Sequence, residues 1–386
     1  MSAKRCVLII LAIPAMFYLL LIIVDPFAVI HNHGFRMHGK EMRLMAAGAI
    51  NDGKYDSFIV GTSMLQNCSA RELEKLMPKT RFANISMPGS SFYERSFILD
   101  YVFTNKLKVK NIIYSLDDHY FDQRMERTTY PIANYVYLYD KNKLNDGKLY
   151  FSFLTVKTIA DYITHFKEYQ NDENIQDYNM PNRYGEGEMM LLGGLDSWFK
   201  HHDNRTIKNT LAEIDELRNK FMHGEKIKFS SDKEREKAIS AAINYCREYV
   251  LKYVDKEKET DFYLFFPPYS RLRYAQWYQY NIKNAEMYFA VVKFFVEEAA
   301  KRGNMYVFGF DNDDFLDDIS VYIDMAHYEP DKNSYMNREM SAKRHLLTPQ
   351  NMNTYLEEAK KRGEEFDFLA VADRVHDFLN DLKKKK

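Results

Sequence analysis

Ser57-Phe-Ile-Val-Gly-Thr-Ser63 places a serine two residues after a glycine that ends a short apolar run. The β-branched and aromatic residues of the run predict a buried strand. Ser69-Ala-Arg-Glu72 has the spacing of a capping box, which predicts a helix that extends to about Met77. Ser63 is therefore expected just past the carboxyl end of a strand, where open α/β sheets bind their ligands. Taken alone, Gly61-Thr62-Ser63 is more typical of a plain polar turn.

Four further apolar runs alternate with helical patterns along the chain. They predict strands over residues 81–86, 111–116, 261–266 and 304–310. The helices between and after them are expected over about 93–105, 230–253, 281–302, 333–346, 348–362 and 368–382. This alternation indicates right-handed crossovers and a parallel sheet. We therefore predict an α/β fold, with a three-layer, flavodoxin-like parallel sheet of about five strands.

Residues 121–228 interrupt the alternation. The stretches Tyr135-Val-Tyr-Leu-Tyr139 and Tyr178-Asn-Met-Pro-Asn-Arg-Tyr184 are polar and rich in tyrosine, and a weak helical pattern covers 155–169. So long an interruption predicts an inserted cap on the ligand-binding side of the sheet rather than a separate domain. The α/β domain is then expected over residues 54–382, followed by a basic tail over 383–386.

The amino terminus has the pattern of a membrane anchor. Lys4 and Arg5 precede 19 uncharged residues, Cys6 to Val24. A helix of this length spans roughly the ~30 Å hydrocarbon core of a bilayer. No small-residue cleavage pattern follows, so residues 1–26 are predicted to be an uncleaved transmembrane signal anchor. The preceding positive charges predict a cytoplasmic amino terminus, with the main domain outside the cell membrane.

A juxtamembrane connector is expected over residues 27–53, with a helix from about 40 to 49. Its histidines, His31, His33 and His38, match no familiar metal-site spacing, so a solvated stalk is the preferred interpretation. The acidic run 311–318 lacks the central glycine and the terminal glutamate of an EF-hand loop. It predicts a loop followed by a helix, and no metal, nucleotide or other cofactor is expected.

Charge and cysteine content narrow the function classes further. The formal net charge is −1, so the chain lacks the excess of positive charge that is typical of nucleic-acid-binding proteins. The three cysteines, Cys6, Cys68 and Cys246, are too few for a disulfide framework. A bridge between Cys68 and Cys246 stays open as a less favoured alternative.

Asp324-Met-Ala-His327 is the second candidate for chemistry. An aspartate three residues before a histidine can accept a hydrogen bond from Nδ1 and leave Nε2 to take a proton from a serine. A serine needs such a base to become a nucleophile. Because parallel strands share one carboxyl edge, Ser63 and His327 are expected to meet there. Aspartate and histidine also occur at this spacing by chance.

Together these segments resemble the SGNH or GDSL family of esterases and acyltransferases. Gly61-Thr62-Ser63 is similar to the first sequence block of the family, and Asn84-Ile-Ser-Met-Pro-Gly89 is similar to its second block. Asp324-Met-Ala-His327 is similar to its last block. The resemblance implies that Ser63, Asp324 and His327 are catalytic. It also implies an oxyanion hole made by the backbone amides of Ser63 and Gly89.

The third block departs from the family. Where the family usually has an asparagine as oxyanion donor, this chain has Leu116-Asp117-Asp118-His119. We expect this segment to be a solvated strand end. Asp117, Asp118, His119 and Tyr328 are candidate substrate contacts.

The predicted anchor and the stretch Tyr137-Leu-Tyr-Asp-Lys-Asn142 resemble a bacterial cell-surface subgroup. Its members include proteins for alginate O-acetylation and teichoic-acid D-alanylation. The resemblance implies a serine-dependent O-acyltransferase or acyl esterase acting on a cell-envelope polysaccharide or teichoic-acid-like polymer, with an acyl-serine intermediate. If the chain is a transferase, a multi-pass membrane acyl-transfer partner would supply its acyl group.

Two other functions remain open on the sequence. The absent third-block asparagine favours a catalytically inactive SGNH-like scaffold that binds the polymer. A secreted lipase would need an apolar groove in the cap, whereas this cap is polar.

Overall fold

The structure, a computed structural model, describes residues 3–31, 37, 42–105, 108–117, 126, 128–171 and 185–384. For residues 3–11, 154, 169 and 170 it describes the backbone alone.

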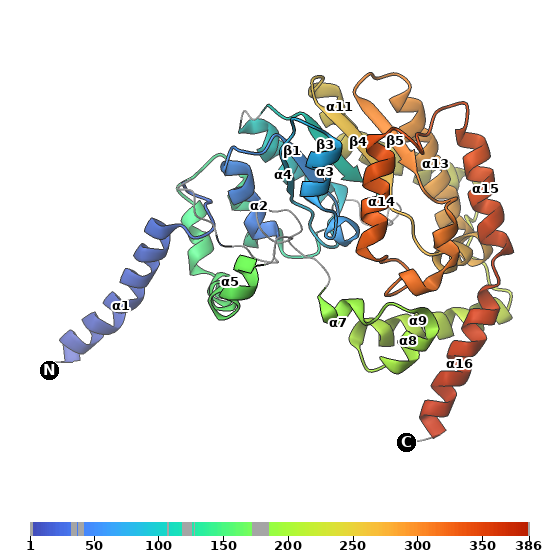
Figure 1. The fold of residues 1–386 in the computed structure, drawn as a ribbon, viewed down its shortest axis with the longest axis horizontal. Helices are drawn as coiled ribbons and strands as arrows, with labels where there is room; N and C mark the ends of the chain where they lie inside the picture. Colours follow the sequence, from blue (N-terminus) through green and yellow to red (C-terminus); the bar gives the residue numbers. More distant parts are fainter. Residues whose placement is uncertain are drawn as a thin grey trace.

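A five-stranded parallel sheet forms the centre of the molecule, as predicted. Its strands are β1 (Ser57–Val60), β2 (Phe82–Asn84), β3 (Asn111–Ser115), β4 (Asp261–Phe266) and β5 (Met305–Gly309). They lie in the order β2-β1-β3-β4-β5, and every neighbouring pair is parallel. Phe58, Ile113, Leu264 and Val307 are completely buried because helices cover both faces of the sheet. The carboxyl ends of the strands therefore share one edge (Figure 1).

The helices between the strands agree with the predicted pattern in most places. They are α3 (Ala70–Leu76), α4 (Phe92–Thr104), α10 (Asp232–Cys246), α11 (Lys252–Lys256), α13 (Ile282–Ala299), α14 (Pro330–Ser341), α15 (Met352–Glu365) and α16 (Phe368–Lys384). The predicted cap of α3 is present, since Ser69 Oγ accepts from the Glu72 amide at 3.2 Å. A π turn, η6 (Arg247–Leu251), separates α10 from α11.

Two parts of the chain differ from their predicted secondary structure. The acidic run after β5 forms two short 3₁₀ turns, η8 (Asp314–Asp317) and η9 (Ile319–Val321), and not the expected helix. After β4 the chain forms α12 (Arg271–Ala275) and η7 (Gln276–Tyr280), which the sequence pattern did not predict. Cys68 and Cys246 are both buried and unbridged.

The insertion packs against the sheet domain at two separate places. Its first described part holds η2 (Ile132–Asn134), η3 (Val136–Tyr139), η4 (Asp146–Phe151), α5 (Phe153–Thr164) and α6 (Phe166–Asn171), and η3 contacts α4. Its second part holds α7 (Glu186–Met189), α8 (Gly194–Lys200) and α9 (Arg205–Met222). Helix α9 lies along α16 and builds a second apolar core around the completely buried Trp198 (Figure 1). The tyrosine-rich stretch 178–184 lies outside the described residues.

Helix α1 (Ala3–Val24) forms at the predicted anchor and extends away from the body of the molecule (Figure 1). It ends at Asp25, whose buried carboxylate accepts hydrogen bonds from the Ile30 and His31 amides at 2.8 and 2.7 Å. The Tyr150 hydroxyl donates to the same carboxylate. Among the described residues, no helix is both long and apolar enough to cross a membrane.

The expected solvated stalk over residues 27–53 is wrong for the part that the structure describes. Phe27 and Val29 are completely buried, and α2 (Met42–Asn51) is buried along almost its whole length. Apart from Arg43 and Asn51 this helix is apolar, so it packs between α4 and η3 rather than standing in solvent. His31 is exposed, whereas His33 and His38 lie outside the described residues.

Gly48→Ala tests this packing. A Cβ atom at Gly48 would lie 1.9 Å from the carbonyl oxygen of Phe27, a backbone atom that has no rotamer to change. We expect the substitution to destabilise the protein by about 1–3 kcal/mol, as overpacking does. Chemical denaturation followed by circular dichroism measures this. Gly303→Ala is the control, because its Cβ would meet nothing within 4 Å. Equal stability of the two variants would contradict the packing of α2.

Candidate active site

Ser63 stands at the carboxyl end of β1 because the chain turns sharply at Gly61. A Cβ atom on Gly61 would lie 2.4 Å from Ser115 Oγ and 2.6 Å from Leu65 Cδ1, so a side chain would not fit there. Ser63 begins the 3₁₀ turn η1 (Ser63–Leu65), and Thr62 Oγ1 accepts from the Met64 amide at 3.2 Å. The turn leaves Ser63 half-buried at the edge of the sheet.

The structure brings Ser63, His327 and Asp324 together. Ser63 Oγ lies 2.8 Å from His327 Nε2, and His327 Nδ1 lies 2.7 Å from Asp324 Oδ2. The His327 side chain is 29% exposed, so the imidazole is reachable from solvent. Two residues 264 positions apart in the chain are thus in hydrogen-bond contact. This is the geometry of a nucleophile, a base and the carboxylate that orients the base.

The two titratable groups shift each other's pKa in opposite directions. Burial raises the pKa of Asp324, but the charge of His327 and hydrogen bonds from the His327 ring and from the amides of His327 and Ala326 lower it to about 2. Burial lowers the pKa of His327, but the Asp324 carboxylate and, more weakly, the charge of Asp117 raise it above its ordinary value of 6.5. The pair therefore holds Asp324 ionised and makes His327 a stronger base.

The loop that carries His327 is fixed from two sides. Ser270, which follows β4, donates its amide and its hydroxyl to Met325 O at 3.2 and 2.7 Å. Met325 and Ile323 are buried in the second apolar core, against the side chains of α9 and α16. Within the loop, the Ile323 amide donates to His327 O at 2.9 Å. The second part of the insertion therefore helps to position the imidazole.

A buried ion pair lies beneath the Ser63 turn. Arg95 Nη2 donates to Asp117 Oδ1 at 2.8 Å, and the two side chains are 0% and 1% exposed. Thr62 Oγ1 donates to Asp117 Oδ2, and Ser115 Oγ donates to Oδ1 at 3.0 Å. Arg95 also donates to the carbonyl oxygens of Ser115 and Ser90, at 2.5 and 3.0 Å. The ion pair thus joins the segments that follow β1, β2 and β3: Thr62 bonds to its carboxylate, and Ser90 and Ser115 bond to its guanidinium.

Two predicted substrate contacts are corrected by these neighbours. Asp117 is buried in the ion pair, so the expected solvated strand end is wrong at this residue. Tyr328 is also buried, and its hydroxyl donates to Met64 O at 3.3 Å behind the Ser63 turn. Both side chains therefore contact other parts of the protein rather than solvent. Asp118 and His119 lie outside the described residues.

Gly89 lies in the loop after β2, which is hydrogen-bonded to the Gly61 turn. The Met87 amide and the Ser90 hydroxyl donate to Gly61 O at 2.8 and 3.2 Å. Gly89 has a φ of 66°, which favours glycine. Within the described part of the chain, the amides of Ser63 and Gly89 have no hydrogen-bond acceptor. Neither amide is therefore committed to an acceptor within those residues.

Sequence reasoning missed Arg95 and the positioning role of Thr62. The signal for Arg95 was weak, because Glu94 precedes this arginine and Ser96 follows it, which is typical of an exposed part of a helix. A buried charge needs a compensating partner. Its partner Asp117 could not be identified from the sequence, since the contact joins two segments that only the folded sheet brings together.

These observations define an α/β protein that carries a Ser–His–Asp arrangement at the carboxyl edge of a parallel five-stranded sheet. No protein-family model matches the chain, and no curated protein sequence does.

Arg95→Met tests the buried ion pair. The substitution leaves the Asp117 carboxylate buried without its cation, which typically costs about 3–5 kcal/mol. We expect a loss of unfolding free energy of that size in chemical denaturation. Arg374→Met is the control, because the Arg374–Asp196 pair is 61% and 91% exposed and should contribute less than about 1 kcal/mol. A small loss in Arg95→Met would contradict the structural role of the pair.

The histidine–aspartate pair predicts the titration of His327. NMR of protein with ¹⁵N-labelled histidine should give a pKa for His327 above its ordinary value of 6.5, since Asp324 stabilises the imidazolium. Asp324→Asn removes that charge and should lower the pKa. An unchanged His327 pKa in Asp324→Asn would show that the carboxylate does not act on the ring.

Proposed function

We propose that this chain is an SGNH-like serine acyltransferase or acyl esterase. The observation that carries the proposal is the continuous contact from Ser63 Oγ through the His327 ring to Asp324. A serine hydroxyl is a weak nucleophile until a base removes its proton, and this arrangement supplies an oriented base with a raised pKa.

The proposed reaction proceeds in two steps. In the first, His327 Nε2 accepts the proton of Ser63 as Oγ bonds to the carbonyl carbon of an ester or thioester. The resulting tetrahedral oxyanion collapses, and the leaving group departs with the proton from His327. In the second step, His327 takes a proton from a sugar hydroxyl or from water as that oxygen attacks the acyl-serine. The bond to Ser63 Oγ then breaks, and Oγ receives the proton from His327. Transfer to the sugar hydroxyl makes the protein a transferase, and transfer to water makes it an esterase.

The proposed oxyanion hole consists of the amides of Ser63 and Gly89. One such donor contributes on the order of 10²–10³ in rate in other acyl-transfer enzymes. Asp117 does not oppose this role, because the Arg95 guanidinium neutralises its carboxylate and Thr62 Oγ1 donates a hydrogen bond to it. The carboxylate in place of the third-block asparagine is thus compatible with catalysis.

We propose a polymer of the cell envelope as the substrate and the cell membrane as the location. Helix α1 would anchor the chain, since its described part exposes large apolar side chains, among them Ile13, Met16 and Leu20 at 64%, 69% and 56%. Exposed apolar surface on this scale needs a lipid or protein cover. A transferase at this location would receive its acyl group from a multi-pass membrane partner.

Labelling with a fluorophosphonate tests the nucleophile. Labelling should fall by at least 90%, about a tenfold change, when Ser63 is replaced by alanine, because among the described residues this is the serine that contacts an oriented base. Ser320→Ala, a serine in the turn that precedes the Asp324 loop, should label like the wild type. Gel fluorescence measures all three proteins. Equal labelling of Ser63→Ala, or no labelling of the wild type, would favour the inactive scaffold.

A further inference from the structure

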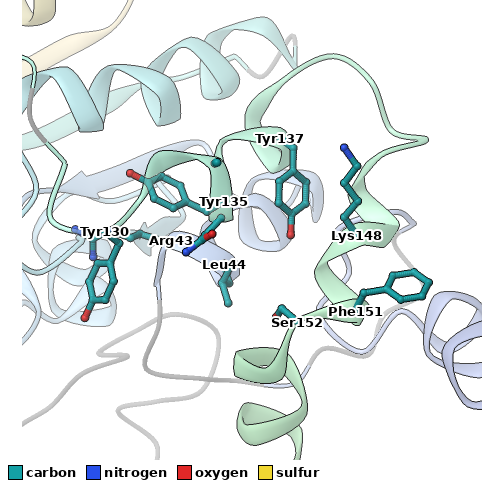
Figure 2. Close-up of a pocket in the computed structure, with 10 residues that line it drawn as sticks. Arg43, Leu44, Tyr130, Tyr135, Tyr137, Lys148, Phe151 and Ser152 are labelled. Atoms are coloured by element: carbon teal, nitrogen blue, oxygen red, sulfur yellow. The ribbon is translucent and has the colours of Figure 1, made fainter. Parts of the chain in front are cut away.

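A cavity of about 520 Å³ lies between α2 and the first part of the insertion (Figure 2). Its volume falls within the roughly 300–1,000 Å³ of small-molecule sites. The residues that line it are Arg43, Leu44, Tyr130, Ala133, Asn134, Tyr135, Tyr137, Lys148, Phe151 and Ser152. The Ser–His–Asp arrangement uses none of them.

The wall of this cavity combines ring faces with hydrogen-bonding groups. Tyr130 and Phe151 are 48% and 60% exposed, and Figure 2 shows the Tyr137 ring beside the Lys148 side chain. The Lys148 ammonium lies 5.9 Å from the centre of that ring. Asparagine and serine side chains add polar groups to the same wall. Sugars present an apolar C–H face and a polar edge of hydroxyls, so a wall of this kind suits a sugar ring.

The charge of the cavity favours an acidic ligand. Among the described lining residues none is acidic, and Lys148 is exposed. The charge of Arg43 is offset by Glu94, which lies behind it and is completely buried. The ammonium of Lys148 is therefore the charge that the cavity presents.

One side of the cavity is held rigidly before any ligand arrives. Arg43 Nε and Nη2 donate to the two Glu94 carboxylate oxygens at 2.6 and 3.2 Å. The Tyr135 hydroxyl donates to Glu94 Oε1 at 2.5 Å, and the Arg43 guanidinium lies 4.7 Å from the centre of the Tyr130 ring. Binding there would require little ordering of these side chains, which reduces its entropic cost.

The same side is bonded to the loop that carries Gly89. Arg43 Nη2 donates to Pro88 O at 2.9 Å, and Thr129 Oγ1, next to Tyr130, donates to Gly89 O at 2.5 Å. A ligand in the cavity would thus lie against residues that also support the proposed oxyanion glycine.

We propose that this cavity binds a sugar unit of an acidic glycan, with the ring against Tyr137 and the carboxylate or phosphate at Lys148. The inference rests on the proposed function, because it identifies the cavity as the site that holds the polymer for acyl transfer. A fatty acyl chain fits this wall less well, since it has no group along its length that pairs with the Lys148 ammonium or bonds to the polar side chains.

Binding of the full chain to an array of acidic and neutral oligosaccharides tests the proposal. We expect glycans that bear carboxylates or phosphates to bind. Carboxylate and phosphate glycans occupy different spots of the array, so the array shows which of the two acid classes binds. For the strongest binder, titration calorimetry should show at least tenfold weaker binding by Lys148→Gln, with Lys148→Arg close to the wild type. Tyr137→Ala should weaken binding to a similar extent. Lys148 is exposed, so its replacement leaves the fold intact.

Two controls separate this inference from the proposed catalysis. Ser63→Ala should bind the same glycan as the wild type, because the cavity does not include the serine. Leu144→Ala should also bind normally, since Leu144 is 95% exposed and does not line the cavity. The proposal is overturned if no acidic glycan binds, or if Lys148→Gln binds the strongest glycan as tightly as the wild type.

Discussion

The buried ion pair between Arg95 and Asp117 is the interaction on which the proposed site depends. Its members belong to α4 and to the segment after β3, and through Thr62 and the carbonyl oxygens of Ser90 and Ser115 it joins three adjacent strand ends. A charged pair with almost no exposure is tolerated only when its remaining hydrogen-bonding groups are satisfied, as they largely are for this carboxylate. The pair therefore fixes the floor of the site without taking part in the proposed chemistry.

The second requirement is that the loop bearing His327 meets the turn bearing Ser63. The parallel order of the strands places both segments at one edge, but it does not fix the ring within 2.8 Å of the hydroxyl. Ser270 and the apolar core around Trp198 supply that precision, because they hold the loop through Met325. The insertion thus has two uses: its second part supports the base, and its first part forms the cavity of Figure 2.

The strands and their parallel pairing were predictable because each strand is a short apolar run that ends in a turn, and helices connect consecutive strands. The proximity of Ser63 and His327 followed from the same rule. Asp117 was misjudged because its burial depends on Arg95, a partner that sequence spacing does not reveal. Residues 27–53 were misjudged as a stalk for a related reason. Helix α2 is buried because surfaces of η3 and α4 cover it. These elements are distant in the chain, so the sequence of residues 27–53 does not predict the contact.

The central claim is that Ser63 forms a covalent acyl intermediate. Mass spectrometry of the protein mixed with p-nitrophenyl acetate and quenched in acid within milliseconds tests it most directly. The account predicts a mass gain of one acetyl group on the peptide that contains Ser63, and no gain in Ser63→Ala. Absence of this adduct from the wild-type protein, or its presence on another residue, would contradict the account.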